Sequence, residues 1–215
     1  DVKQLLKDGV VVSNGKKIKS SGAHVDPEKD EIYVDGEKIV YLKYVYYMLN
    51  KPDGYVSATE DNLYPTVIDL IKEYHPGLFP VGRLDVDTEG LLLITNDGQL
   101  AHRLLSPRTH VPKTYYVKVK GRLGIGDINA FTKGIPLEDF TCMPAFLNII
   151  KSGEISECEV TIYEGKFHQV KRMFQACGKE VVYLKRISMG ELKLDESLKL
   201  GHYRPLTDEE INSIL

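Results

Sequence analysis

The segment from Gly82 to Gly90 holds the residues best suited to chemistry, because it brings an arginine and three carboxylates together between two glycines. It reads Gly-Arg-Leu-Asp-Val-Asp-Thr-Glu-Gly, and the apolar run 91–94 follows at once. Glycine adopts backbone angles that other residues resist, so this segment suits a tightly shaped loop before a buried strand. A carboxylate beside a cation stays ionised, as a nucleophile or base must be. The same spacing also fits a polar turn that leads into a core strand.

Three further segments carry polar residues in distinctive order. They are 47–55 (Tyr-Met-Leu-Asn-Lys-Pro-Asp-Gly-Tyr), 113–115 (Lys-Thr-Tyr) and 164–174 (Glu-Gly-Lys-Phe-His-Gln-Val-Lys-Arg-Met-Phe). Together with the segment 82–98, they resemble, in the expected order, the motifs of the RNA pseudouridine synthases. The resemblance is to the branch of that family that includes the RsuA and RluB types, and it covers residues 40–210.

This resemblance implies an isomerisation in which uracil leaves its ribose, turns, and rejoins through carbon in place of nitrogen. Since the product is an isomer, it implies no cofactor, no metal and no second substrate. Asp85 would be the catalytic carboxylate, and covalent attack and abstraction of a ribose proton stay open as its two routes. Tyr115 would stack on the uracil, and Lys171 would pair with Asp85. The target base must flip out, because its glycosidic bond is unreachable in a stacked helix.

Other positions of the motifs receive supporting roles from the same resemblance. Val170 would form an apolar floor under the base. His168 and Arg172 would hold backbone or phosphate. Arg83 fits either a phosphate clamp or a plug that moves when a nucleotide enters.

The neighbours of the expected catalytic residues serve as comparisons. Asp87 lies two residues after Asp85, and alternation along an extended loop predicts that it points to the other side. Asp87 and Glu89 are therefore expected to be structural. Tyr116 should lie on the strand face opposite Tyr115, and we expect it in the core.

The charges along the chain are segregated. The net charge is only −3, whereas phosphate contacts usually dominate nucleic-acid affinity. However, residues 101–122 contain six basic residues and no acid, and residues 165–186 contain six basic residues against Glu180 alone. Such local segregation is the electrostatic footprint of a nucleic-acid-binding face. The expected RNA contacts in the first block are Arg103, Arg108 and Lys113.

The chain is long enough for one ordinary domain and a small appendage. It has 215 residues, of which 42% are hydrophobic. We expect residues 1–41 to form the appendage and residues 42–215 to form the pseudouridine synthase catalytic domain.

The first 41 residues resemble the back half of an S4 RNA-binding domain, with the front of that module missing. The pairs Asn14-Gly15 and Asp35-Gly36 are strong signals for hairpins. In this interpretation Lys16 and Lys17 would face phosphate. The alternative is a small β appendage with solvated lysines.

Within the expected catalytic domain, strand and helix patterns intermix without regular alternation. Strands are predicted at 44–49, 91–94, 115–120 and 159–163, and helices at 66–74, 99–105, 128–133, 169–177 and after 207. This order favours an α+β fold with a mainly antiparallel, mixed sheet flanked by helices, which is also what the resemblance implies.

Composition argues against several other classes. No apolar run approaches the roughly 18 residues of a membrane-spanning helix, and no signal-peptide pattern is visible. Cys142, Cys158 and Cys177 are odd in number and form no CxxC pair, so neither disulfides nor zinc are signalled. We expect a monomer in the reducing cytoplasm.

Within the branch, the chain most resembles the RsuA type, which modifies one uridine of small-subunit (16S) ribosomal RNA. The expected partner is this RNA, free or within an assembling ribonucleoprotein. A large-subunit enzyme of the same branch and a non-catalytic RNA-binding assembly factor are the alternatives. A glycosidase using Asp85 and Glu89 would need an aromatic sugar platform, and the chain has no tryptophan. A metal site from Asp85, Asp87 and Glu89 fits by ligand type alone.

Overall fold

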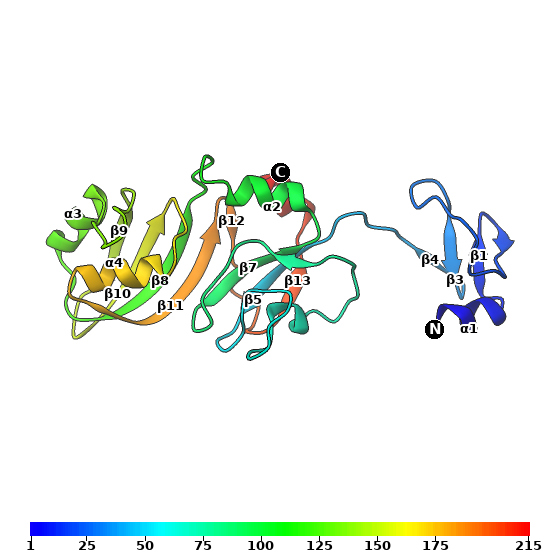
Figure 1. The fold of residues 1–215 in the computed structure, drawn as a ribbon, viewed down its shortest axis with the longest axis horizontal. Coiled ribbons are helices and arrows are strands. Elements are labelled where there is room, and N and C mark those ends of the chain that lie inside the picture. Colours follow the sequence, from blue (N-terminus) through cyan, green and yellow to red (C-terminus); the bar gives the residue numbers. More distant parts are fainter. The chain divides into compact units, whose positions relative to one another are not determined.

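The computed structural model describes all residues, 1–215, and these form two compact units, 1–43 and 44–215 (Figure 1). Each unit has a sheet of its own. The boundary lies two residues beyond the position expected from the sequence.

The first unit consists of one short helix and a four-stranded antiparallel sheet. The helix is α1 (Val2–Lys7), and the strands lie in the order β2-β1-β3-β4. Their bounds are β1 Val11–Ser13, β2 Lys16–Lys17, β3 Ile32–Val34 and β4 Glu37–Ile39. Both expected hairpins are confirmed: Asn14-Gly15 joins β1 to β2 and Asp35-Gly36 joins β3 to β4, and all four residues have positive φ. Two-residue hairpin turns of this type require such angles.

The second unit is built on a nine-stranded sheet in the order β13-β5-β7-β11-β8-β10-β9, with β6 and β12 paired to β7 and β11. The strands are β5 Tyr46–Lys51, β6 Phe79–Pro80, β7 Glu89–Thr95, β8 Lys113–Lys120, β9 Phe146–Lys151, β10 Ile155–Ile162, β11 Glu180–Met189, β12 Leu192–Lys193 and β13 Tyr203–Pro205. Only β7 and β11 pair in parallel, over two residue pairs. The sheet is therefore mixed and mainly antiparallel, as the sequence predicts.

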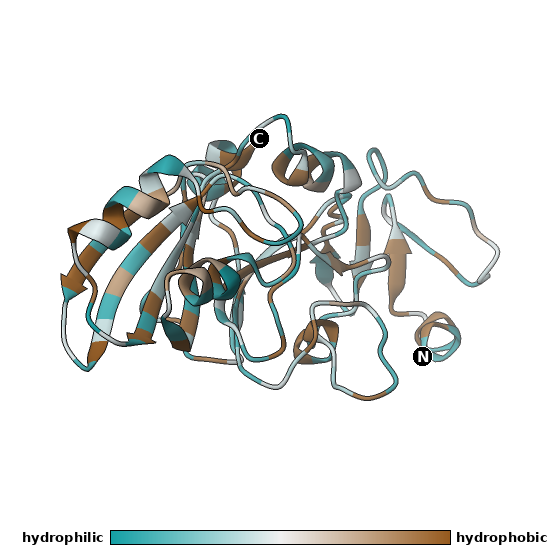
Figure 2. Cartoon of the chain, turned by 60° about the vertical axis from the view of Figure 1, so that its left-hand side comes forward, coloured by the Kyte–Doolittle hydropathy of each residue, from teal (hydrophilic) through white to brown (hydrophobic).

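Helices cover parts of both sheet faces. They are the 3-10 helix η1 (Val67–Leu70) and the α-helices α2 (Gly98–Leu105), α3 (Ile125–Lys133), α4 (Gln169–Ala176) and α5 (Asp208–Ile214). The α-helices carry hydrophilic and hydrophobic residues side by side (Figure 2). Residues of α3 and α4 belong to one apolar core, and residues of α2 and α5 to a second one. None of the helices has the length and apolar character needed to cross a membrane.

Strand β7 lies between the two cores. Leu92 and Ile94 belong to the first core, and Leu91 and Leu93 belong to the second. Burial on both faces explains why the sequence shows an unbroken apolar run here.

The predicted helix at 66–74 is wrong, because only the 3-10 helix η1 forms in that segment. Ile71 is already extended, with φ −87° and ψ 120°. The amide of Lys72, which would continue a helix, donates instead to the Tyr203 hydroxyl at 2.9 Å. The β-branched Val67 and Ile68 further weaken the helical preference.

Candidate active site

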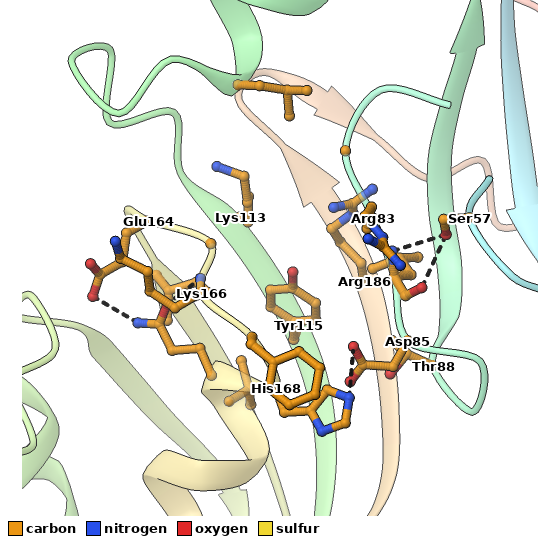
Figure 3. Close-up of a pocket in the computed structure, with 18 of the residues that line it drawn as sticks. Ser57, Arg83, Asp85, Thr88, Lys113, Tyr115, Glu164, Lys166, His168 and Arg186 are labelled. Carbon is orange, nitrogen blue, oxygen red and sulfur yellow. Dashed lines mark hydrogen bonds and ion pairs between the residues drawn. The ribbon is translucent and has the colours of Figure 1, made fainter. Parts of the chain in front are cut away.

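A cleft of about 750 Å³ opens over strand β8, bounded by the loop 82–88 and the start of α4. This volume is typical of sites that bind small molecules. Six of the residues singled out in the sequence line it: Arg83, Asp85, Lys113, Tyr115, His168 and Val170. Figure 3 shows side chains from three of the four segments, 82–98, 113–115 and 164–174, around the same space. Segments that are far apart in the sequence therefore form one site.

The loop that carries Asp85 is a reverse turn whose backbone is fixed by hydrogen bonds. The amide of Thr88 donates to the carbonyl of Asp85 at 3.0 Å, which closes the turn. The Ser57 hydroxyl donates to the carbonyl of Leu84 and accepts from its amide, both at 3.0 Å. These bonds fix the backbone on both sides of the carboxylate.

Lys51, at the end of β5, holds the same loop from the interior. Its side chain is fully buried, and its Nζ donates to the carbonyls of Pro52 and Val86 at 3.0 Å and of Thr88 at 2.9 Å. Burial lowers the pKa of Lys51 to about 8, although neighbouring carboxylates such as Asp53 oppose the shift. Sequence reasoning missed this residue. The signal that could have found it is a lysine at the end of an otherwise buried strand.

The Asp85 carboxylate is paired with the lysine expected from the sequence. Lys171 Nζ lies 3.0 Å from Asp85 Oδ2, and His168 Nε2 lies 3.6 Å from Asp85 Oδ1. The side chains of Asp85 and Lys171 are 26% and 24% exposed. Burial alone would lower the pKa of Lys171, but its hydrogen bonds to Asp87 and Asp85 outweigh burial and raise it.

The expectation that Asp87 points away from Asp85 is wrong. Lys171 Nζ lies 2.5 Å from Asp87 Oδ1, so both carboxylates contact one ammonium group. The segment is a turn and not an extended strand, and side-chain alternation therefore does not apply. Burial alone would raise the pKa of Asp87, but the hydrogen bond and charge of Lys171 lower it overall.

Tyr115 lies near the start of β8 and is almost fully buried at the cleft. Its neighbours across the sheet are Val160 of β10 and Arg186 of β11. Tyr116 faces the other side of the sheet, as expected, but it is not in the core. It is only half-buried, and its hydroxyl donates to Glu157 in a short hydrogen bond.

The segment 164–174, here called the third motif, is held by a group of hydrogen bonds just before α4. Glu164 Oε1 accepts from the amide of Met143 and from Gln169 Nε2, both at 2.8 Å. His168 has a left-handed backbone with φ 48°, which turns the chain into the helix. Val170 then faces the cleft, where it is buried.

The other basic residues expected to contact RNA lie outside the cleft lining. Arg172 forms an ion pair with Asp139, and its Nη1 donates to the carbonyl of Phe167 at 3.5 Å. Arg103 and Arg108 are exposed on α2 and on the turn after it, and Ser106, Pro107 and His110 of the same region line the cleft. In the first unit, Lys16 and Lys17 are exposed on β2.

The carboxylates of the loop do not converge on a single point. Glu89 Oε2 accepts from the Tyr183 hydroxyl at 2.6 Å, whereas Asp85 and Asp87 share Lys171. No group of three or more histidine, cysteine or acidic side chains is arranged to hold a metal ion. This geometry opposes the alternative of a metal site at these three residues.

The fold and the cleft define a class of enzyme when they are compared with known proteins. The sequence pattern of the RNA pseudouridylate synthase family matches residues 45–176. A crystal structure of a pseudouridylate synthase superposes with a TM-score of 0.74 at 40% identity, over 99% of this chain and 92% of that one. This chain therefore belongs to the RNA pseudouridylate synthase family, whose members are isomerases that act on RNA.

Particular relatives extend the likeness over nearly the whole chain. The chain is 49% identical to a Bacillus subtilis protein described as an uncharacterized RNA pseudouridine synthase, YtzG, over 99% of this chain and 90% of the relative. It is 42% identical to the ribosomal small subunit pseudouridine synthase A of Escherichia coli, over 98% of this chain and 91% of the relative.

Proposed function

We propose that this protein converts one uridine of small-subunit ribosomal RNA to pseudouridine, with Asp85 as the catalytic carboxylate. The observation that carries the proposal is the Asp85 carboxylate, half-buried in the cleft and held 3.0 Å from Lys171. The likeness to small-subunit enzymes such as the one from Escherichia coli supports this choice of RNA.

In this reaction the bond from N1 of uracil to C1′ of ribose breaks, and a bond from C5 to C1′ forms. The proton on C5 is released, and N1 takes up a proton, so atoms balance without a second substrate. Asp85 either attacks covalently or removes a ribose proton, and both routes begin with an ionised carboxylate. Lys171 supplies the opposite charge that favours this ionised form in a partly desolvated site.

The remaining residues of the cleft would hold the flipped nucleotide. The Tyr115 ring would stack on the uracil, and its hydroxyl could assist proton transfer. Val170 would form the apolar floor beneath the base. His168 would hold backbone or phosphate, and the exposed Arg83 would contact phosphate. The exposed Arg103 and Arg108 would contact more distant RNA. Arg172, which already holds the backbone of the third motif, would keep that motif in place.

The first unit, residues 1–43, would serve as an S4-like RNA-binding module. Its exposed Lys16 and Lys17 suit contact with phosphate. We further propose that the protein acts as a monomer in the cytoplasm. The three free cysteines, Cys142, Cys158 and Cys177, suit a reducing compartment.

Tritium release from RNA labelled at C5 of uridine tests the proposal, because forming the new bond expels that hydrogen. Small-subunit and large-subunit ribosomal RNA would be compared, each as free RNA and as assembly intermediates. Release from the small-subunit RNA alone is the expected result. Release from the large-subunit RNA alone would show that the substrate is large-subunit RNA. Binding without release from any substrate would favour a non-catalytic assembly factor.

A further inference from the structure

Arg186 is a buried cation at the cleft whose charge has no carboxylate partner. It lies on β11 directly across from Tyr115, and it is only 2% exposed. Its Nε donates to the carbonyl of Leu91 at 2.8 Å, but its Nη2 is buried and has no hydrogen-bond partner. A buried donor without a partner is costly, and for a charged group the cost is greater still. Arg186 also lines the cleft (Figure 3).

Lys113 is a second buried cation on the same face of the sheet. It precedes Tyr115 by two residues on β8, and its side chain faces the cleft with 9% of the residue exposed. Its Nζ donates only to the carbonyl of Val111, at 2.9 Å. Burial lowers the pKa of Lys113, and the positive charge of Arg186 lowers it further. The two cations therefore repel each other.

The acids of the cleft do not compensate this charge. Only two carboxylates line it, Asp85 and Glu164. Asp85 contacts Lys171, and Glu164 accepts hydrogen bonds from Met143 and Gln169. Neither Lys113 nor Arg186 forms a salt bridge with them. The exposed cations Arg83 and Lys166 also line the cleft and add to the positive charge.

We propose that Lys113 and Arg186 form a phosphate subsite, which binds a phosphodiester group next to the target uridine and so draws that nucleotide into the cleft. The subsite rests on the proposed function, since it names the part of the RNA held beside the reacting base. Phosphate suits it because a phosphodiester carries one negative charge, which offsets part of the positive charge of the two cations. Its two free oxygens can accept hydrogen bonds from Lys113 Nζ and from the unpartnered Nη2 of Arg186. The uracil base is neutral before the reaction and offers no such charge.

Inorganic phosphate tests the subsite without any turnover. Thermal unfolding would be followed with phosphate and with sodium chloride of equal ionic strength, for the wild type and for Lys113→Met, Arg186→Met and Lys118→Met. Lys118 is the matched control, since it lies on β8 but on the opposite face. Phosphate should raise the unfolding temperature of the wild type and of Lys118→Met, and have little effect on the other two. Equal shifts in all four proteins would overturn the proposal.

The unliganded variants give a second readout. Because Lys113→Met removes a buried, repelled charge, it should unfold at the same or a higher temperature than the wild type. A gain in stability combined with weaker RNA binding is the pattern expected of a ligand site. A loss of stability would mean that the ammonium serves the fold, and would count against the subsite. This variant also keeps the test decisive if Arg186→Met fails to fold.

RNA carrying a neutral methylphosphonate in place of one phosphodiester identifies the bound group. Two oligonucleotides would be used, neutral on the 5′ side or on the 3′ side of the target uridine. For the wild type, one of the two modified RNAs should bind roughly tenfold more weakly than the unmodified RNA. For Lys113→Met, that same modified RNA should bind as tightly as the unmodified RNA. The proposal would be overturned if both modified RNAs lost the same affinity for the wild type as for Lys113→Met.

Kinetics separate a phosphate subsite from stabilisation of the departing base. Loss of a phosphate contact should raise KM and leave kcat nearly unchanged. It should also reduce the slope of log affinity against log salt by about 0.7. A fall in kcat with unchanged KM would instead assign the cations to charge that develops on the uracil, and would contradict the subsite. If the wild type forms no product, the proposed function fails, while the inorganic-phosphate result still decides whether the anion site exists.

Discussion

At the scale of single residues, the site depends on Lys171, whose ammonium group contacts two carboxylates. Its ammonium contacts Asp85 at 3.0 Å and Asp87 at 2.5 Å, so one cation serves two carboxylates. Without it, two negative charges would stand side by side in a partly buried loop, which favours protonation of one of them. Lys171 therefore supports the ionised Asp85 that the proposed chemistry requires.

Replacing this lysine should impair turnover more than folding. We expect Lys171→Met to lower kcat/KM by about 10²-fold or more, and Lys171→Arg to retain part of the activity because it keeps the charge. Initial rates of tritium release give the measurement. Lys179→Met is the control, since Lys179 pairs with Asp127 outside the cleft. An unchanged rate for Lys171→Met would show that the ion pair is dispensable.

Lys51 links the stability of the fold to pH. Its pKa is lowered from 10.5 to about 8 by burial, so the folded state releases this proton at a lower pH than the unfolded chain does. Between these two values the unfolded state binds more protons, and stability must therefore rise with pH. Below pH 8 the full cost of burying the charge is present.

Denaturant unfolding of the wild type and Lys51→Met checks this link. Lys51→Met should be less stable at pH 7, since it leaves the carbonyls of Pro52, Val86 and Thr88 without their donor; the loss should be about 3 kcal/mol. Between pH 8 and pH 10.5, the gap between the two proteins should widen by about 1 kcal/mol per pH unit, and it should level off above that range. A gap that stays constant or narrows would show that Lys51 does not titrate as the structure requires.

At the scale of elements, the close parallel pairing of β7 and β11 limits which residue can occupy position 90. Gly90 has φ +103°, and a Cβ placed on it would lie 2.2 Å from the backbone oxygen of Arg186. Only glycine allows the two strands to approach this closely. The approach also brings Arg186 of β11 to the cleft beside the loop that ends at Gly90.

Substitution of this glycine should therefore disrupt the sheet. We expect Gly90→Ala to lose more than about 3 kcal/mol of unfolding free energy or to fail to fold. Gly98→Ala, at the start of α2, is the control, because a Cβ there meets nothing within 4 Å. It should be nearly neutral. Circular dichroism during denaturation measures both, and comparable losses would refute the steric argument.

Local signals predicted the elements well where they coincided with the tertiary structure. The hairpins at 14–15 and 35–36 followed from turn residues that accept positive φ. The strand at β7 followed from its apolar run, because both of its faces are buried. The helix at 66–74 failed because a distant hydroxyl, that of Tyr203, takes the amide that would have continued it. Such a competitor is not visible in the local pattern.

The site itself was predictable only in part. The motifs place Asp85, Tyr115 and Lys171 in order along the chain, and the structure brings them to one region. The turn that directs Asp87 toward Lys171 depends on the buried Lys51 beneath it. Neither spacing nor charge pattern reveals such support, because it comes from a strand more than 30 residues earlier in the chain.

At the scale of the whole molecule, the chain forms two compact units. Residues 1–43 and 44–215 each form a compact body with its own sheet. The cleft is lined wholly by residues of the second unit. We therefore expect the second unit to carry out the proposed chemistry and the first unit to add RNA affinity.

Removing the first unit tests this division. A chain of residues 44–215 should fold cooperatively and unfold at nearly the temperature at which these residues unfold in the full protein. Its kcat should change little, while its affinity for RNA should fall about tenfold through lost phosphate contacts. Calorimetry and fluorescence anisotropy give the two measurements. Unchanged affinity would argue against an RNA-binding role for residues 1–43.

The most direct test of the central claim compares Asp85→Asn with Asp87→Asn by tritium release from labelled small-subunit RNA. Both substitutions remove one carboxylate from the same lysine, so they are closely matched in charge and position. Asp85→Asn should lower the rate by at least about 10³-fold, while Asp87→Asn should stay within about tenfold of the wild type. Substantial release by Asp85→Asn, or equal losses in both variants, would contradict the assignment of Asp85 as the catalytic carboxylate.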